Sequence, residues 1–383
     1  MLATTARADR AEITLRREVT KSFLGLAVPR RAPDNSVVDI ADLTFLAGGG
    51  ECGERMRAMD WSASPLGPPQ RWPQSLKTCV RIVLTSRQPM FVWWGDKLIN
   101  LYNDPYRAIV GGKHPEALGR PAAEVWSEIW SEIGPRVATV LEKNEGTYDE
   151  ALLLIMERHG YPEETYYTFS YSPVPDDQGK IRGILCANTD ETQRIIGERQ
   201  LALLRELGLR AGQARTLAEA CLRSAEALAT NPRDFPFATI YLADTERREM
   251  VLAGAAGIIS GHPAAGEKIS LDAPKPWPFR EVIAQGEIRV LSKLDPELTL
   301  PRGPWADPPR QAVMQPIVAG GTTGVLVIGL NPLRLFDDGY RRFVELVGAQ
   351  IGAAFGNAQA YQDEKKRAEA LAELDRAKTA FFS

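Results

Sequence analysis

Cysteine and histidine are the side chains of this sequence that could most readily bind a metal or act as a nucleophile or base. The 383 residues contain four cysteines and three histidines: Cys52, Cys79, Cys186, Cys221, His114, His159 and His262. No two cysteines form a CxxC pair, and no histidine stands at metal-ligand spacing from them. No nucleophile, base and orienting group converge in the sequence. We therefore expect reduced cysteines, no metal site and no catalytic residue.

The local context of the histidines also differs from that of a haem ligand. His114 follows two glycines and a lysine, so we interpret it as a loop residue. His159 adjoins Gly160 in a predicted hairpin turn, and His262 adjoins Pro263. Cys186 lies in a predicted strand and is interpreted as a small core residue rather than a redox switch. The sequence assigns no cofactor.

Length and charge narrow the class of protein. A chain of 383 residues favours two to three domains. The 46 basic and 49 acidic residues give a net charge of −3, which predicts no nucleic-acid partner. No apolar run approaches the roughly 20 residues that span a bilayer, and the N-terminus lacks the apolar core of a signal peptide. We therefore expect no membrane partner and a cytoplasmic location.

The last stretch of the chain predicts a long charged helix, because no Gly or Pro interrupts it after Asn357. Its apolar side chains are few but share one heptad seam: Ala360, Leu371, Leu374 and Phe381. Glu364, Arg367 and Lys378 occupy the other seam positions. The helix could lie in solvent, or it could form a parallel two-stranded coiled coil over 358–383. We favour the coiled coil and a homodimer through helices, since a helix with so little apolar surface seldom persists alone.

The segment from Met59 onward has a distinctive order of elements. An amphipathic helix with Leu76, Val80 and Val83 on one face precedes two short apolar strands, MFVWWG and KLINLYN. Several small helices follow. Three longer strands, TYDEALLLIME, ETYYTFSYSPV and IRGILCANTD, then close the unit, with DDQG as the hairpin turn between the last two.

This order resembles the layout of a PAS domain. The blocks WWG, LYNDPYR, LGRPAAEVW, EETYYTFSYSPV and NTDET resemble the PAS subfamily found ahead of bacterial, often hybrid, histidine kinases. The resemblance implies a PAS domain with an N-terminal cap over 54–191. It also implies that Asp190 and Thr192 tie the last strand to the helix that follows.

The flanking segments complete the predicted α+β organisation of two sensory domains, each an antiparallel sheet with flanking helices, joined and followed by long helices. The helical pattern of 192–211 predicts a connecting helix. Residues 212–357 resemble a GAF domain, chiefly through ATIYLAD and QPIVAGGTTGVLVIGL. Residues 1–53 mix charge clusters with Pro and Gly, which predicts a poorly ordered tail.

Aromatic side chains of the predicted PAS domain are candidates to line a cavity for a small molecule, with one amide as a polar anchor. The candidates are Trp94, Tyr102, Asn103, Tyr106, Trp126, Tyr167 and Phe169. Core packing is the simpler use, because the aromatics of the strand ETYYTFSYSPV alternate with Thr and Ser. In the predicted GAF domain, Trp277 to Phe279 could cover a pocket or form a fixed corner. Three glycines four residues apart, Gly348, Gly352 and Gly356, could contact either the sheet or a second chain.

The final residues LDRAKTAFFS resemble the run that leads into the dimerisation helix of sensor histidine kinases, just before the phosphoacceptor His box. The resemblance implies the input region of a two-component sensor histidine kinase, which controls autophosphorylation of a kinase core. It implies that core and a response regulator or receiver domain as downstream partners. The alternative is a PAS and GAF oligomerisation scaffold coupled to another output or to none. Leu371, Leu374 and Phe381 are the candidate dimer and signalling residues.

Overall fold

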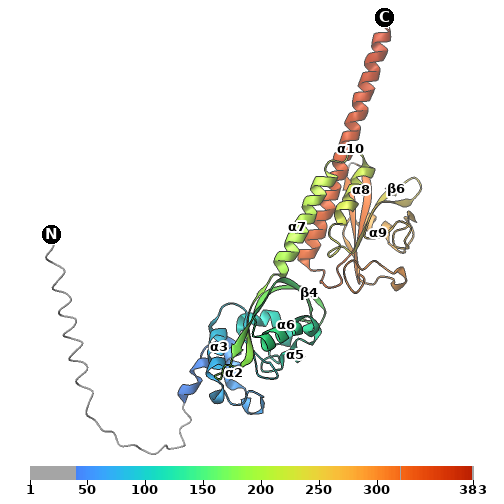
Figure 1. The fold of residues 1–383 in the computed structure, drawn as a ribbon. Coiled ribbons are helices and arrows are strands. Elements are labelled where there is room, and N and C mark those ends of the chain that lie inside the picture. Colours follow the sequence, from blue (N-terminus) through green and yellow to red (C-terminus); the bar gives the residue numbers. More distant parts are fainter. Residues whose placement is uncertain (1–39, 320, 382–383) are drawn as a thin grey trace, which may run out of the picture. The chain divides into compact units, whose positions relative to one another are not determined.

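The structure is a computed structural model that describes residues 40–319 and 321–381. Its first sheet has five antiparallel strands in the order β2-β1-β5-β4-β3 (Figure 1). The strands are β1 Met90–Trp94, β2 Ile99–Tyr102, β3 Thr147–Met156, β4 Glu163–Pro175 and β5 Ile181–Asp190. The three long strands lie where the sequence predicts them. The predicted turn joins β4 to β5, with the Asp176 carboxylate accepting from the amides of Gln178 and Lys180.

Short helices fill the connection between β2 and β3. They are η4 Asp104–Tyr106, α4 Arg107–Val110, η5 Gly111–Lys113, α5 Ala122–Val125, η6 Ser127–Ile129 and α6 Trp130–Lys143. The sequence predicts a helix from about Pro135 to Lys143, with the proline at its start. In the structure α6 begins earlier, and Pro135 lies inside it. The buried face of α6 carries Ile133, Val137 and Val140, and these side chains continue past the proline in helical register. The packed apolar face therefore sets the extent of the helix.

Helices also precede the first sheet. They are η1 Ile40–Leu46, α2 Gly50–Ala58, η2 Trp61–Ala63, η3 Pro69–Arg71 and α3 Gln74–Thr85. The prediction of a poorly ordered tail over 1–53 is wrong for the residues of η1 and for the start of α2, and 1–39 lie outside the described residues. The glycine triplet is the entry to α2: Gly49 and Gly50 have φ of 75° and 58°. A Cβ on Gly50 would collide with the Asp104 carboxylate, so a close approach requires glycine there.

The connecting helix α7, Thr192–Ala211, covers the range that the sequence gives to it. Its first residue is tied to the first sheet on both sides. The Asp190 carboxylate accepts from the Thr192 amide at 2.9 Å, and the Thr192 hydroxyl accepts from the Tyr166 amide at 3.0 Å. The strand end and the helix start are therefore one hydrogen-bonded unit, as the resemblance to PAS domains implies.

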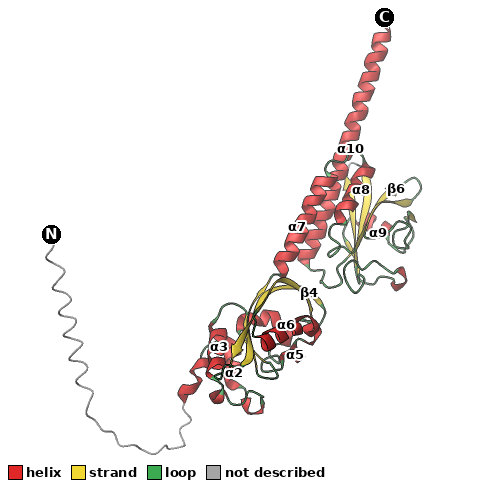
Figure 2. Ribbon diagram, in the orientation of Figure 1, coloured by secondary structure: helices red, strands yellow, loops and turns green. Residues whose placement is uncertain are grey.

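The second sheet has six antiparallel strands in the order β8-β7-β6-β11-β10-β9 (Figure 2). The strands are β6 Phe237–Asp244, β7 Glu249–Ala256, β8 Lys268–Ser270, β9 Arg289–Leu291, β10 Ala312–Ala319 and β11 Thr322–Gly329. The helices after α7 are α8 Leu217–Leu228, α9 Phe279–Gln285, η7 Pro296–Leu298 and α10 Asp338–Phe381. The sequence predicts two strand pairs here, FPFATIYLAD with EMVLAGAAG and AVMQPIVAG with TTGVLVIGL, and the four long strands lie in these blocks. The short strands β8 and β9 lie in a Pro-rich segment whose pattern predicts irregular structure.

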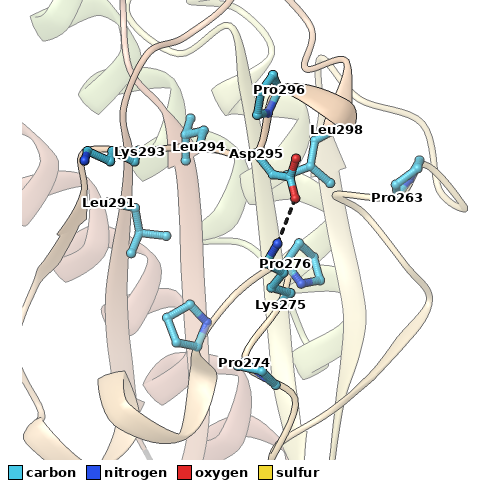
Figure 3. A pocket seen from close by; sticks show the side chains of 11 residues that line it. Pro263, Pro274, Lys275, Pro276, Leu291, Lys293, Leu294, Asp295, Pro296 and Leu298 are labelled. Carbon is cyan, nitrogen blue, oxygen red and sulfur yellow. Dashed lines mark hydrogen bonds and ion pairs between the residues drawn. The ribbon is translucent and has the colours of Figure 1, made fainter.

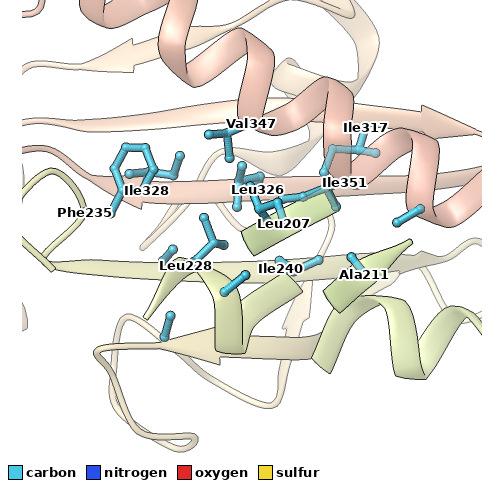
Figure 4. Packing of buried hydrophobic residues seen from close by; sticks show 14 of the residues in the cluster. Leu207, Ala211, Leu228, Phe235, Ile240, Ile317, Leu326, Ile328, Val347 and Ile351 are labelled. Carbon is cyan, nitrogen blue, oxygen red and sulfur yellow. The ribbon is translucent and has the colours of Figure 1, made fainter. Parts of the chain in front are cut away.

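This second sheet is covered on both faces. On one face, α7, α8 and α10 pack through side chains such as Leu207, Leu228 and Ile351 (Figure 4). On the other face, the segment between β7 and β10 contributes Trp277 and Phe279 to a second apolar cluster. Both aromatic side chains are fully buried. Trp277 and Phe279 are therefore core residues, which favours the fixed corner, while Pro278 between them is only half-buried.

The helix α10 has two dissimilar halves. From Tyr340 to Ala358 it packs against the second sheet, and Gly348 allows its backbone to approach Gln315 of β10, where a Cβ would collide. Tyr361 still lies against the Arg215 guanidinium, and beyond it none of the described elements flanks the helix (Figure 1). Leu371 and Leu374 are 70% and 69% exposed there. The side chain of Phe381 lies outside the described part of the chain.

Candidate functional site

The first sheet and its short helices enclose a small cavity of about 20 Å³. Four of the seven candidate residues line it: Tyr106, Trp126, Tyr167 and Phe169. The other lining residues are Phe91, Trp93, Ile109, Ile129, Ile133, Leu154, Met156, Tyr171 and Asn188. A cavity needs roughly 10–15 Å³ to hold one water molecule. The aromatic side chains thus fill most of the space, and a larger ligand requires them to move.

Trp94 and Tyr102 do not line this cavity. Strand residues alternate between the two faces of a sheet, so Phe91 and Trp93 of β1 face the cavity while Trp94 faces away. Trp94 packs over Gly183 of the neighbouring strand, where a Cβ would collide with its ring. Glycine at this position therefore makes room for the indole.

Asn103 is the third candidate that does not line the cavity. Its side chain forms hydrogen bonds with backbone groups of three neighbouring segments. Its Nδ2 donates to the carbonyl oxygens of Val83 and Gln88 at 3.0 and 2.8 Å. Its Oδ1 accepts from the amides of Met90 and Tyr106 at 3.0 and 3.2 Å. The side chain joins the end of α3, the start of β1 and the first turn of η4, so its function in this structure is architectural.

The hydroxyl of Tyr102 lies instead against His114, which is in a turn, as its context suggests, but has a mostly buried side chain. The Tyr102 hydroxyl lies 2.8 Å from Nδ1 of His114, and Nε2 of His114 lies 3.3 Å from the Glu51 carboxylate of α2. Burial raises the pKa of Tyr102 well above its ordinary value. No local pattern predicts the contact between His114 and Glu51, because these residues are 63 positions apart. The trio holds α2 against the first sheet.

Two polar atoms at the cavity have no hydrogen-bond partner among the described residues. They are Nε1 of Trp126 and Oδ1 of Asn188, and both side chains are buried. Nε1 can only donate and Oδ1 can only accept. A small neutral molecule with one acceptor and one donor would satisfy atoms that otherwise carry a desolvation cost. Asn188, which the sequence analysis missed, faces Phe169 across β4 and β5.

A line of polar contacts runs from the cavity wall to the start of α7. Nη1 of Arg158 donates to the Tyr167 hydroxyl at 3.2 Å and to the Asp190 carboxylate at 3.1 Å. Nη2 of the same guanidinium pairs with Glu163 at 2.9 Å. Burial raises the pKa of Tyr167 above its ordinary value, so the hydroxyl stays protonated. Displacement of Tyr167 would therefore act, through Arg158, on the carboxylate that accepts from the first amide of α7.

The second domain has an open groove of about 650 Å³ outside its core (Figure 3). Five prolines line it: Pro263, Pro274, Pro276, Pro278 and Pro296. Lys275 donates to the Asp295 carboxylate at 3.1 Å, and this bond and the Glu297 amide lower the pKa of Asp295. The charged groups of the groove thus partly satisfy one another, and we assign no ligand to it.

Metal binding and thiol reactivity depend on how the candidate ligands and the thiols are placed in the described part of the chain. Within residues 40–319 and 321–381, no group of three His, Cys, Asp or Glu residues could hold a metal ion. The four cysteines are buried free thiols. Burial raises the pKa of Cys79 and raises that of Cys221 to about 12. Protonated, enclosed thiols are poor nucleophiles. None of the described helices is long and apolar enough to cross a membrane.

Comparison with known families bears on both sheets. Residues 85–195 match the family model of the PAS fold, and residues 213–355 match that of the GAF domain. The chain therefore carries a PAS domain followed by a GAF domain, and the predicted α+β fold class is confirmed. No curated protein matches the chain.

Solved structures of low identity resemble the second domain. One is the GAF domain of a phosphoenolpyruvate-protein phosphotransferase from Acinetobacter, with 17% identity over 43% of this chain and 97% of that one, at a TM-score of 0.33. Another is residues 122 to 287 of a methyl-accepting chemotaxis protein, with 20% identity over 40% and 97%, at 0.32. A third is the free methionine-R-sulfoxide reductase of Neisseria meningitidis in complex with its substrate, with 17% identity over 42% and 90%, at 0.33.

Proposed function

We propose that this chain is the signal-sensing input region of a two-component sensor histidine kinase of the cytoplasm. In this proposal it works as a homodimer and controls autophosphorylation of a kinase core that then serves a response regulator or receiver domain. The PAS and GAF domains support the sensory part of the proposal. The resemblance of LDRAKTAFFS to the segment before the phosphoacceptor box supports the kinase part.

The observation that carries the proposal is the second half of α10. It leaves the GAF core with Leu371 and Leu374 on one side, both largely exposed. Between them and the core, Ala360 and Arg367 continue the same heptad seam. A second copy of the helix would cover this seam in parallel register. Because the seam is mostly polar, the pair would be weak enough for the sensory domains to bias its state.

Sedimentation of the full chain tests the dimer. We expect the wild type to be a dimer at micromolar concentration and the Leu371→Asp/Leu374→Asp double variant to be a monomer, because the seam loses two of its four apolar side chains and gains like charges that face each other. Ala372→Asp adds a charge to the same helix outside the seam and should leave the dimer intact. When the proposed kinase core is present, the double variant should also autophosphorylate at a rate that no longer responds to the sensory domains. A monomeric wild type, or a dimeric double variant, would refute this assignment of the seam.

A second candidate function is an oligomerisation scaffold whose PAS domain binds no ligand. The small cavity of about 20 Å³ favours it. Dimerisation through α10 is common to both candidates, whereas control of autophosphorylation belongs to the kinase proposal. Loss of the dimer in the seam variant without any change in phosphorylation would favour the scaffold.

A further inference from the structure

A buried cluster of charged and polar side chains joins the PAS domain to the GAF domain. Its members come from β4, from α7 and from two loops of the GAF domain. We call it the Arg199 cluster, and it consists of Glu164, Arg199, Asp234, Asn331 and Arg334. The site described above does not include it. Paired glutamates at the start of a strand would ordinarily be placed at the surface, yet both Glu163 and Glu164 are buried.

Arg199 is the centre of the cluster, since it binds a carboxylate of each domain. Its Nη1 and Nη2 donate to Glu164 of β4 at 2.6 and 3.2 Å. Its Nη2 and Nε donate to Asp234 of the GAF domain at 2.6 and 3.1 Å. Two edges of one planar guanidinium are thus used at once. A lysine ammonium cannot reproduce this arrangement, because it lacks the rigid fork.

A loop after β11 binds the same strand of the PAS domain. Nδ2 of Asn331 donates to Glu164 at 2.7 Å. The Glu164 amide also donates to the carbonyl oxygen of Leu333 at 3.1 Å. On the GAF side, the Tyr340 hydroxyl donates to the backbone oxygen of Asp234 and accepts from the Asn331 amide at 3.2 Å. The contact therefore includes main chain as well as side chains of both domains.

Burial makes these contacts consequential. The side chains of Glu164 and Asp234 are 0% exposed, and that of Arg199 is 15% exposed. A buried carboxylate that loses its cation is strongly unfavourable. Burial by itself would lower the pKa of Arg199, but its bonds to Glu164 and Asp234 raise it above the ordinary value. If α7 turned relative to β4, Arg199 could not keep both carboxylates.

We infer that the Arg199 cluster makes the PAS domain, α7 and the GAF domain one cooperative unit. A change at β4 is then transmitted to the GAF domain through buried charge pairs, in addition to the continuous backbone of α7. This inference concerns the coupling between the two domains and does not depend on a kinase as the output. It remains testable if the proposed function fails.

The test is calorimetric unfolding of the full chain together with native-state hydrogen exchange. For the wild type we expect one transition, with equal opening constants for β4 of the PAS domain and β10 of the GAF domain. For Arg199→Gln we expect two transitions, and opening constants that differ by at least about tenfold, within the range of measured couplings between contacting groups. Asp234 keeps its bonds to Asn231 and Arg334 in this variant, so the GAF domain should still fold.

Two control variants separate coupling from general stability. Arg334→Gln removes another cation from Asp234, at 3.0 Å, but that pair lies within the GAF domain, so one transition should remain. Arg205→Gln changes an exposed position of α7 and should resemble the wild type. Glu164→Gln removes the PAS carboxylate that Arg199 binds, so this variant should show the same two transitions as Arg199→Gln. Two transitions in the wild type, or one transition at a lower midpoint in both Arg199→Gln and Glu164→Gln, would overturn the inference.

Discussion

The PAS and GAF domains bury their sheets in different ways. On its cavity face the PAS sheet lies against aromatic side chains and short helices, where a small cavity remains and two polar atoms have no partner among the described residues. The GAF sheet is covered on both faces by apolar clusters, and the proline-lined groove borders the second cluster through Leu291, Leu294 and Leu298. Trp277, at the position where a ligand could be covered, is fully buried with Nε1 bonded to Ala264 at 2.8 Å.

This difference separates two ways of responding to a small molecule. A molecule that enters the PAS interior must displace aromatic side chains, and Tyr167 is linked through Arg158 to the cap of α7. A molecule that binds the GAF groove can do so without disturbing the core. The PAS interior is therefore the better candidate for an input that moves the connecting helix.

The largest loss of stability is expected at Trp277, in the closely packed core of the GAF domain. Trp277→Ala should lower the free energy of unfolding of the GAF domain by about 3–5 kcal/mol, because it removes a fully buried indole and opens a cavity. Hydrogen exchange of β10 and β11 measures this quantity. Trp277→Phe is the matched variant and should cost less, since most of the ring volume stays. A loss below about 1 kcal/mol for the alanine variant would mean that this core is less tightly packed than the structure indicates.

A smaller loss of stability is expected where Asp104 binds the start of α2, a contact that we call the polar tether of the PAS domain. Asp104 accepts from the amides of Glu51 and Cys52 at 3.0 and 2.8 Å, so it caps α2 from across the domain. Asp104→Asn should weaken the protection of the α2 amides by about 1–2 kcal/mol, because the charged acceptor is lost. Asp177→Asn is the matched control, since Asp177 caps α3 through Gln74 and Ser75. It should affect α3 and leave α2 unchanged.

The same tether predicts a dependence on pH. Burial would raise the pKa of Asp104, but the Cys52 and Glu51 amides outweigh burial and hold the pKa below its ordinary value. A lowered pKa means that the stabilisation is present above the unfolded value near about 3.9 and is lost as pH falls through the folded value. The difference between wild type and Asp104→Asn should therefore disappear at low pH. A difference that persisted below pH of about 2 would show that the charge is not its source.

Local patterns in the sequence predicted the strands, the connecting helix and the apolar faces, because side-chain period and turn residues act over a few positions. Tyr167 and Phe169 lie on one face of β4 for the same reason, and both line the cavity. Trp94 could have been excluded by the alternation of β1. Asn103, His114 and Glu164 could not be understood in this way, since their partners lie far away in the sequence. Contacts between polar residues that are far apart in the sequence produce no periodic pattern from which they could be predicted.

The last comparison concerns one unpartnered polar atom in each domain and predicts the smallest effect. Oδ1 of Asn188 in the PAS domain and Oγ1 of Thr239 in the GAF domain have no partner among the described residues. If both are simply enclosed, Asn188→Leu and Thr239→Val should change the free energy of unfolding by less than about 1 kcal/mol or raise it, because an apolar group of similar shape removes a desolvation cost. Hydrogen exchange of β5 and β6 gives the two values in one experiment. A loss of about 1–3 kcal/mol for Asn188→Leu, with no loss for Thr239→Val, would mean that Asn188 has a bound partner in solution. The PAS interior would then differ from the GAF interior in holding a polar molecule, and not merely in how completely it is packed.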